Sequence, residues 1–115
     1  DNHGHAAGDE VLRAVAQEMQ TTVRLSDALA RWGGEEFVLM LSDTRAALAR
    51  GGLERLRERV AQLCVLVPEG ELRVSVSAGL AEHRPGETVE ETLARADAAL
   101  LDAKHQGRNR VVLAA

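Results

Sequence analysis

Apolar residues recur at two spacings along the chain, and these spacings predict its secondary structure. Helical spacing predicts three amphipathic helices, one beginning near Asp9, one over about residues 45–64 and one opened by Thr88 or Val89. Two adjacent glycines in the second helix favour a bend or break there. The residues expected to face the core are Leu12, Val15, Ala16, Met19, Leu53, Leu56, Val60, Leu63, Cys64, Leu93, Ala96, Leu100 and Ala103.

Strict alternation of apolar and polar residues predicts a strand over residues 72–80. Shorter apolar runs predict strands over about residues 28–32, 36–41 and 110–113. The order of these elements indicates an α/β domain with helices on a mostly antiparallel sheet.

The composition suits one small soluble domain. The chain has 115 residues, and Trp32 and Phe37 are its only aromatic residues. A formal net charge of −4 argues against a nucleic-acid-coating surface, and without a basic tract or long apolar span we expect no direct membrane contact. The single cysteine, Cys64, is expected to be a buried structural thiol in a cytoplasmic protein.

Residues 33–36 place two glycines and two glutamates between apolar runs, which predicts a hairpin with carboxylates at its tip. Gly33 and Gly34 allow close approach of a ligand to the main chain. Glu35 and Glu36 offer the oxygen ligands that a hard divalent cation such as Mg²⁺ or Mn²⁺ prefers. The simpler alternative is a solvated hairpin with surface charge.

Other polar residues allow both a structural and a functional interpretation. His3 and His5 could suggest zinc, but a closed site usually needs four ligands and no further histidine or cysteine lies nearby. Asp9 is well placed to cap a helix. Lys104 would be favoured in the last turn of a helix by the dipole alone, with Gly107 as the helix stop.

Several motifs in their order along the chain resemble the GGDEF family, the diguanylate cyclases that condense two GTP into cyclic di-GMP and pyrophosphate. The hairpin Gly-Gly-Glu-Glu-Phe resembles the signature that names the family. The other matching motifs are Gly-His-x-x-Gly-Asp ending at Asp9, Arg-x-x-Asp ending at Asp27, Ser-x-Gly ending at Gly79, Ala-Asp-x-Ala-Leu containing Asp97, and Lys-x-x-Gly-Arg ending at Arg108. The implied fold is a ferredoxin-like nucleotidyl-cyclase palm, in which the Ser-x-Gly would lie in the central strand and Gly79 would allow close packing.

The resemblance implies roles for residues of a GTP site. Glu35 would be a catalytic metal ligand and general base, and Glu36 a second ligand or an orienting group. Asp9 would accept hydrogen bonds from the guanine edge, and Lys104 and Arg108 would hold the phosphates of GTP. Because each domain would hold one GTP, activity would require a homodimer.

The resemblance also implies a product-inhibition site for cyclic di-GMP, formed by Arg24, Asp27 and Arg55. A surface ion pair between Arg24 and Asp27 is the simpler alternative. By comparison with the family, residues 1–115 would be a domain truncated at its N-terminus, without the first strand and helix, of which the strand would supply a further metal-binding aspartate. This part alone is expected to be inactive, and an upstream sensory or regulatory domain is expected. A non-catalytic module that binds cyclic di-GMP or GTP, and a nucleotide-free dimerisation module, remain alternative hypotheses.

Overall fold

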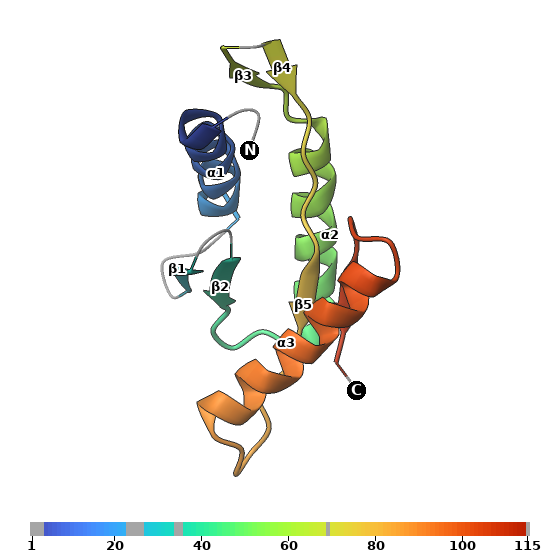
Figure 1. Ribbon diagram of the computed structural model, residues 1–115. Helices are drawn as coiled ribbons and strands as arrows, with labels where there is room; N and C mark the ends of the chain where they lie inside the picture. The colour runs from blue at the N-terminus through green and yellow to red at the C-terminus, as the bar shows by residue number, and fades with distance from the viewer. Residues whose placement is uncertain (1–3, 23–26, 34–35, 69, 115) are drawn as a thin grey trace. The chain divides into compact units, whose positions relative to one another are not determined.

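The computed structural model describes residues 4–22, 27–33, 36–68 and 70–114. These residues form three helices and six short strands (Figure 1). The helices are α1 (Gly4–Gln20), α2 (Ala46–Gln62) and α3 (Val89–His105). The strands are β1 (Ala28–Gly33), β2 (Glu36–Met40), β3 (Val65–Val67), β4 (Gly70–Leu72), β5 (Ala78–Leu80) and β6 (Val111–Leu113). The chain divides into two compact units, and the boundary passes through α2 between Glu58 and Arg59.

The first unit contains α1 and two antiparallel hairpins, β1–β2 and β3–β4. Helix α1 contacts β3, and Val15, Val60 and Val65 are buried in this unit. Arg59, in the last turn of α2, pairs with Glu18 of α1 at 3.5 Å. The predicted face of α1 is therefore partly confirmed, with Val15 at its centre.

In the second unit, α3 packs on the parallel pair β5–β6 (Figure 1). Gly79 of β5 lies directly against the backbone of α3, and a Cβ atom at this position would overlap Ala96 and Leu100. Ala99 and Ala103 of α3 are buried, as is Val111 of β6. Small residues therefore allow the helix and the strands to approach closely, as expected for Gly79 from the sequence.

Both termini of α3 follow the sequence prediction. Thr88 is the N-cap, and its hydroxyl accepts a hydrogen bond from the backbone N–H of Glu91 at 3.1 Å. The Glu91 carboxylate accepts one from the N–H of Thr88 at 2.9 Å, which completes a capping box. Helix α3 then ends at His105, just before Gly107.

Two expectations about helices are wrong. Helix α1 begins at Gly4, so Asp9 lies inside it and is exposed, not at its N-cap. Ala6 and Ala7 are strong helix formers, which explains why the helix extends upstream. Helix α2 continues through Gly51 and Gly52, because packing of a helix face can outweigh a cost of about 1 kcal/mol per glycine.

The structure also corrects two expectations about residues 63–80. Cys64 follows α2 and is exposed, so it is not a buried structural thiol. The alternating segment forms a strand only at its two ends, in β4 and β5. Arg73 to Val76 still alternate between exposed and half-buried positions, but no described strand pairs with them.

None of the helices in the described part of the chain combines the length and apolar character needed to cross a bilayer.

Candidate functional site

The predicted hairpin is present, and its register determines where Glu36 lies. Arg31 pairs with Phe37 and Gly33 pairs with Glu36, with a shift in register between the two pairs. Such an irregularity bends the strand and increases its twist near the tip of the hairpin. Glu36 is half-buried at the first position of β2. Gly34 and Glu35 lie outside the described residues.

The chemistry of the tip fits a hard divalent cation in part. Glu36 supplies one carboxylate, and Glu35 follows Gly34 directly in the sequence. Within the described ranges, no three histidine, cysteine, aspartate or glutamate side chains cluster as a metal site. Glu36 therefore offers a single carboxylate to such a cation among the described residues of the hairpin.

Asp27 closes the open end of the same hairpin. It directly precedes β1, and its Oδ1 accepts a hydrogen bond from the backbone N–H of Ser42 at 2.9 Å, beyond the end of β2. This contact gives Asp27 a structural role that the sequence did not indicate. Arg24, its predicted partner, lies outside the described residues.

The predicted site residues Asp9 and Arg55 lie on helices. Asp9 is exposed in α1, in the first unit. Arg55 is exposed on α2, in the second unit, and its guanidinium lies back along the helix, where a Cβ at Gly51 would be 3.7 Å from Nη1. Gly51 and Gly52 thus leave room for this side chain on the helix surface.

Lys104 and Arg108 lie at the C-terminal end of α3, in the second unit. The N–H of Arg108 donates to the carbonyl of Ala103 at 2.9 Å, and Gly107 has a φ of +119°. This arrangement is a Schellman-type helix end. Lys104 is half-buried, whereas Arg108 is exposed. Both cations are thus presented close to one helix end, as the sequence predicted.

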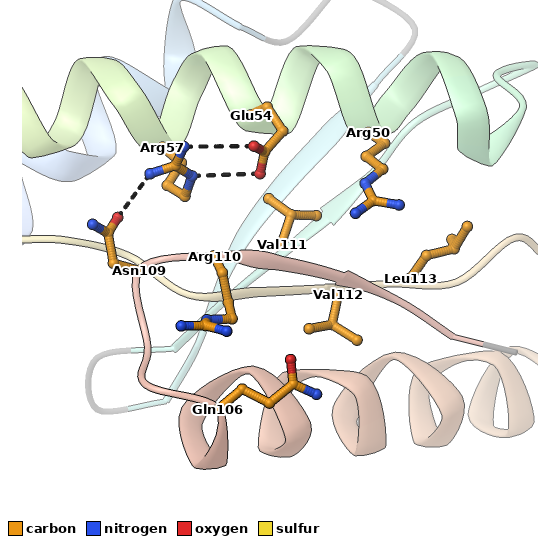
Figure 2. A pocket seen from close by; sticks show the side chains of 9 residues that line it. All are labelled: Arg50, Glu54, Arg57, Gln106, Asn109, Arg110, Val111, Val112 and Leu113. Atoms are coloured by element: carbon orange, nitrogen blue, oxygen red, sulfur yellow. Dashed lines mark hydrogen bonds and ion pairs between the residues drawn. The ribbon is translucent and has the colours of Figure 1, made fainter.

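A contact between α2 and the turn after α3 was not predicted. Nη1 of Arg57 donates to Oδ1 of Asn109 at 3.1 Å (Figure 2). Arg57 also faces Glu54, with Nε and Oε1 3.4 Å apart. Several arginines lie on α2, and their spacing in the sequence does not show which partner each of them contacts.

Arg57 and Asn109 lie at an open pocket of about 540 Å³ in the second unit (Figure 2). Arg50 and Glu54 of α2 contribute to the pocket, together with β6 and the residues that lead into it. Three arginines and one glutamate give the lining a net positive charge, although the formal net charge of the whole chain is −4.

A polar network anchors the loop between β5 and α3. Oε2 and Oε1 of Glu87 lie 2.7 and 2.8 Å from Nε and Nη2 of Arg95. The Thr92 hydroxyl donates to Oε1 at 2.7 Å. The hydrogen bonds from Arg95, and then that from Thr92, lower the pKa of Glu87 well below its usual range, and Glu87 raises the pKa of Arg95.

The stability provided by Glu87 is expected to depend on pH. Because its pKa is lowered on folding, the unfolded chain takes up the proton first, at a pKa of about 4.3, and acid favours unfolding. The contribution should be complete at neutral pH and decline as the pH falls below about 5. Urea unfolding between pH 3 and pH 7 should give a flatter profile for Glu87→Gln than for the unchanged protein. Profiles of equal slope would contradict the prediction.

Comparisons with known proteins show the family and the fold of this chain. The family model "Diguanylate cyclase, GGDEF domain" matches residues 1–110. Diguanylate cyclase DgcM from Escherichia coli is 43% identical over 114 residues, which are 99% of this chain and 27% of that protein. The chain therefore spans only about a quarter of that relative's length.

Two solved structures share the fold closely. Diguanylate cyclase SiaD from Pseudomonas aeruginosa, in complex with its activator SiaC, superposes with a TM-score of 0.93 at 49% identity, over 99% of this chain and 44% of that chain. The GGDEF domain of DgcB from Caulobacter crescentus, in complex with c-di-GMP, gives a TM-score of 0.93 at 35% identity, over 98% of this chain and 68% of that chain. The α/β palm-type fold is thereby confirmed, and the chain belongs to the GGDEF domain family of diguanylate cyclases.

Proposed function

We propose that this domain condenses two molecules of GTP into cyclic di-GMP and pyrophosphate. The observation that carries the proposal is the acidic hairpin tip, with Glu36 opposite Gly33, in a chain of the GGDEF family. In the reaction, the 3′-hydroxyl of each GTP attacks the α-phosphate of the other, so that two phosphodiester bonds form and two pyrophosphates leave. A bound Mg²⁺ or Mn²⁺ would activate the hydroxyl and stabilise the charge that develops on the phosphoryl oxygens.

The chain's own residues would bind and orient GTP. Glu35 and Glu36 would hold the metal, with Glu35 able to accept the proton of the hydroxyl, and Gly33 and Gly34 would leave room for the phosphates. Lys104 and Arg108 would neutralise the phosphates, for which a compact ammonium and a guanidinium fork are suited.

Asp9 would accept hydrogen bonds from the guanine edge. Its position inside α1 supports this role, because the carboxylate is not committed to capping the helix. A carboxylate accepts well from adjacent ring and amino N–H groups.

Regulation is the second part of the proposal. Arg24, Asp27 and Arg55 would bind the product cyclic di-GMP and restrain the enzyme. The DgcB complex with c-di-GMP supports product binding by this family, and the SiaD complex supports control by a protein partner. In this chain, Asp27 also ties the ends of the hairpin, so product binding there would act on the element that carries Glu36.

The active species would be a homodimer, since each domain would hold one GTP and the two reacting groups must meet. We also propose that residues 1–115 are one catalytic domain of a longer protein with a regulatory domain, since they correspond to 27% of DgcM. A further metal-binding carboxylate would come from that longer protein.

Incubation of the full-length protein with GTP and Mg²⁺ tests the proposal. We expect cyclic di-GMP and pyrophosphate in a 1:2 ratio, with a rate per protomer that increases with protein concentration as dimers form. Cyclic di-GMP binding without turnover would instead support a sensor. Absence of binding of both GTP and cyclic di-GMP by calorimetry would support a dimerisation module and overturn the proposal.

A further inference from the structure

The turn that carries Arg108 has an unusual backbone. Gly107, Arg108 and Asn109 have φ values of +119°, +64° and +47°. Glycine adopts such angles readily, but arginine rarely does, and asparagine is among the few side chains that tolerate them. Two successive left-handed residues other than glycine therefore need support from outside the turn.

Three hydrogen bonds from other elements supply this support, and Nε of Arg110 adds a local one to the carbonyl of Arg108 at 3.0 Å. The N–H of Arg108 donates to the carbonyl of Ala103 at 2.9 Å, and the N–H of Asn109 donates to Oγ of Ser77 at 3.1 Å. The third is the 3.1 Å hydrogen bond from Arg57 to the side chain of Asn109. Residues from α3, from the segment before β5 and from α2 thus converge on residues 107–109.

Arg57 is itself held in place. Its Nε and Nη2 lie 3.4 and 3.5 Å from the two carboxylate oxygens of Glu54, and Nη2 lies 3.8 Å from Glu58. The Arg57 side chain is 19% exposed. Because the glutamates already restrict the Arg57 side chain, the hydrogen bond from Nη1 to Asn109 costs little further conformational entropy.

We propose that Arg57 is a positioning residue for the phosphates of GTP. By holding Asn109 it fixes the left-handed turn, and the turn fixes the direction of the Arg108 side chain. This role rests on the proposed function, in which Arg108 binds the phosphates. Arg57 acts through Asn109 and Arg108 and need not touch the nucleotide.

The test measures binding of a non-hydrolysable GTP analogue to the full-length protein by calorimetry with Mg²⁺. Arg57→Ala should weaken binding roughly 3- to 10-fold, which is less than the roughly 10- to 150-fold effect of a direct charge-assisted hydrogen bond because Arg57 acts through the turn. In a protein that already carries Arg108→Ala, the same change should cause no further loss, because Arg57 acts through Arg108.

Arg50→Ala is the matched control for charge. Arg50 extends from the same helix toward β6 and lines the same pocket (Figure 2), but it takes no part in the contacts that hold the turn. Its removal should change affinity less than about twofold. A loss as large as that of Arg57→Ala would mean that the pocket acts only through its charge and would overturn the proposal.

Two substitutions at Asn109 keep the test decisive if Arg57→Ala fails to fold. Asn109→Gly accepts the left-handed backbone but removes the hydrogen-bond acceptor, so it should reproduce the loss. Asn109→Asp keeps an acceptor for Arg57 and should retain most of the affinity. Equal affinities for these two variants would overturn the proposal.

Failure of this role is distinguishable from failure of the proposed function. If Arg108→Ala weakens binding while Arg57→Ala and Asn109→Gly do not, the positioning role alone is overturned. If the unchanged protein does not bind the analogue, both are overturned. An additive loss in the double variant Arg57→Ala with Arg108→Ala would also overturn positioning through Arg108.

Discussion

Replacement of Gly79 by alanine is expected to lower the free energy of unfolding by about 3 kcal/mol, which is the upper part of the usual range for overpacking. A Cβ atom at Gly79 would overlap the backbone of Ala96 and Leu100 in α3. Backbone atoms cannot rotate out of the way as a flexible side chain can. The helix would have to move off β5, and the close contact of α3 with the parallel pair would be lost.

Urea unfolding monitored by circular dichroism measures this effect. Gly8→Ala is the matched control, since Gly8 lies in α1 and has no atom within 4 Å of the position of an added Cβ. That change should stabilise the protein by up to about 1 kcal/mol, because alanine is the better helix former. Unchanged stability in Gly79→Ala would show that α3 does not pack on β5 as described.

Replacement of Glu35 by glutamine is expected to reduce cyclic di-GMP synthesis by more than about 100-fold, since even the outer-shell partners of a metal contribute 10- to 100-fold. The side chain keeps its shape but loses the charge that would hold Mg²⁺ and the capacity to take a proton. Glu36→Gln should also lose synthesis, because it removes the second charge proposed to hold the metal. Glu36 is half-buried at the tip, opposite Gly33.

Radiolabelled GTP and chromatography of the products provide the measurement, in the full-length protein. Glu71→Gln is the matched control, because Glu71 is an exposed glutamate on the other antiparallel hairpin, β3–β4. It should synthesise cyclic di-GMP at the unchanged rate. Full synthesis by Glu35→Gln would remove Glu35 from the catalytic site.

Local patterns predicted the elements that depend on local interactions. The apolar runs around Gly33 and Gly34 predicted the β1–β2 hairpin, and the helical spacing after Thr88 or Val89 predicted the start of α3. Asp9 has the right chemistry for an N-cap, but the alanines before it extend the helix. The strand over residues 72–80 was overpredicted, because alternation describes side chains whereas a strand also needs a hydrogen-bonding neighbour.

For the candidate site, too, the sequence predicted local features but not contacts between distant residues. Lys104 and Arg108 were predicted to lie at one helix end, because Gly107 marks the stop within a few residues. Arg57 was not singled out, since its partner Asn109 is 52 residues away. The link from Asp27 to Ser42 spans 15 residues and was missed for the same reason. Contacts between residues that are far apart in the chain are difficult to predict from a single sequence.

The start of α2 depends on a residue made much later. The Glu82 carboxylate accepts a hydrogen bond from the N–H of Ala46, the first residue of α2, at 2.7 Å across 36 residues of sequence. During synthesis, at roughly 5–20 residues per second, Glu82 is added to the chain about 2–7 seconds after Ala46. The N–H of Ala46 therefore lacks this acceptor until the loop after β5 has been made, so the order of translation delays completion of a helix whose own sequence is already present.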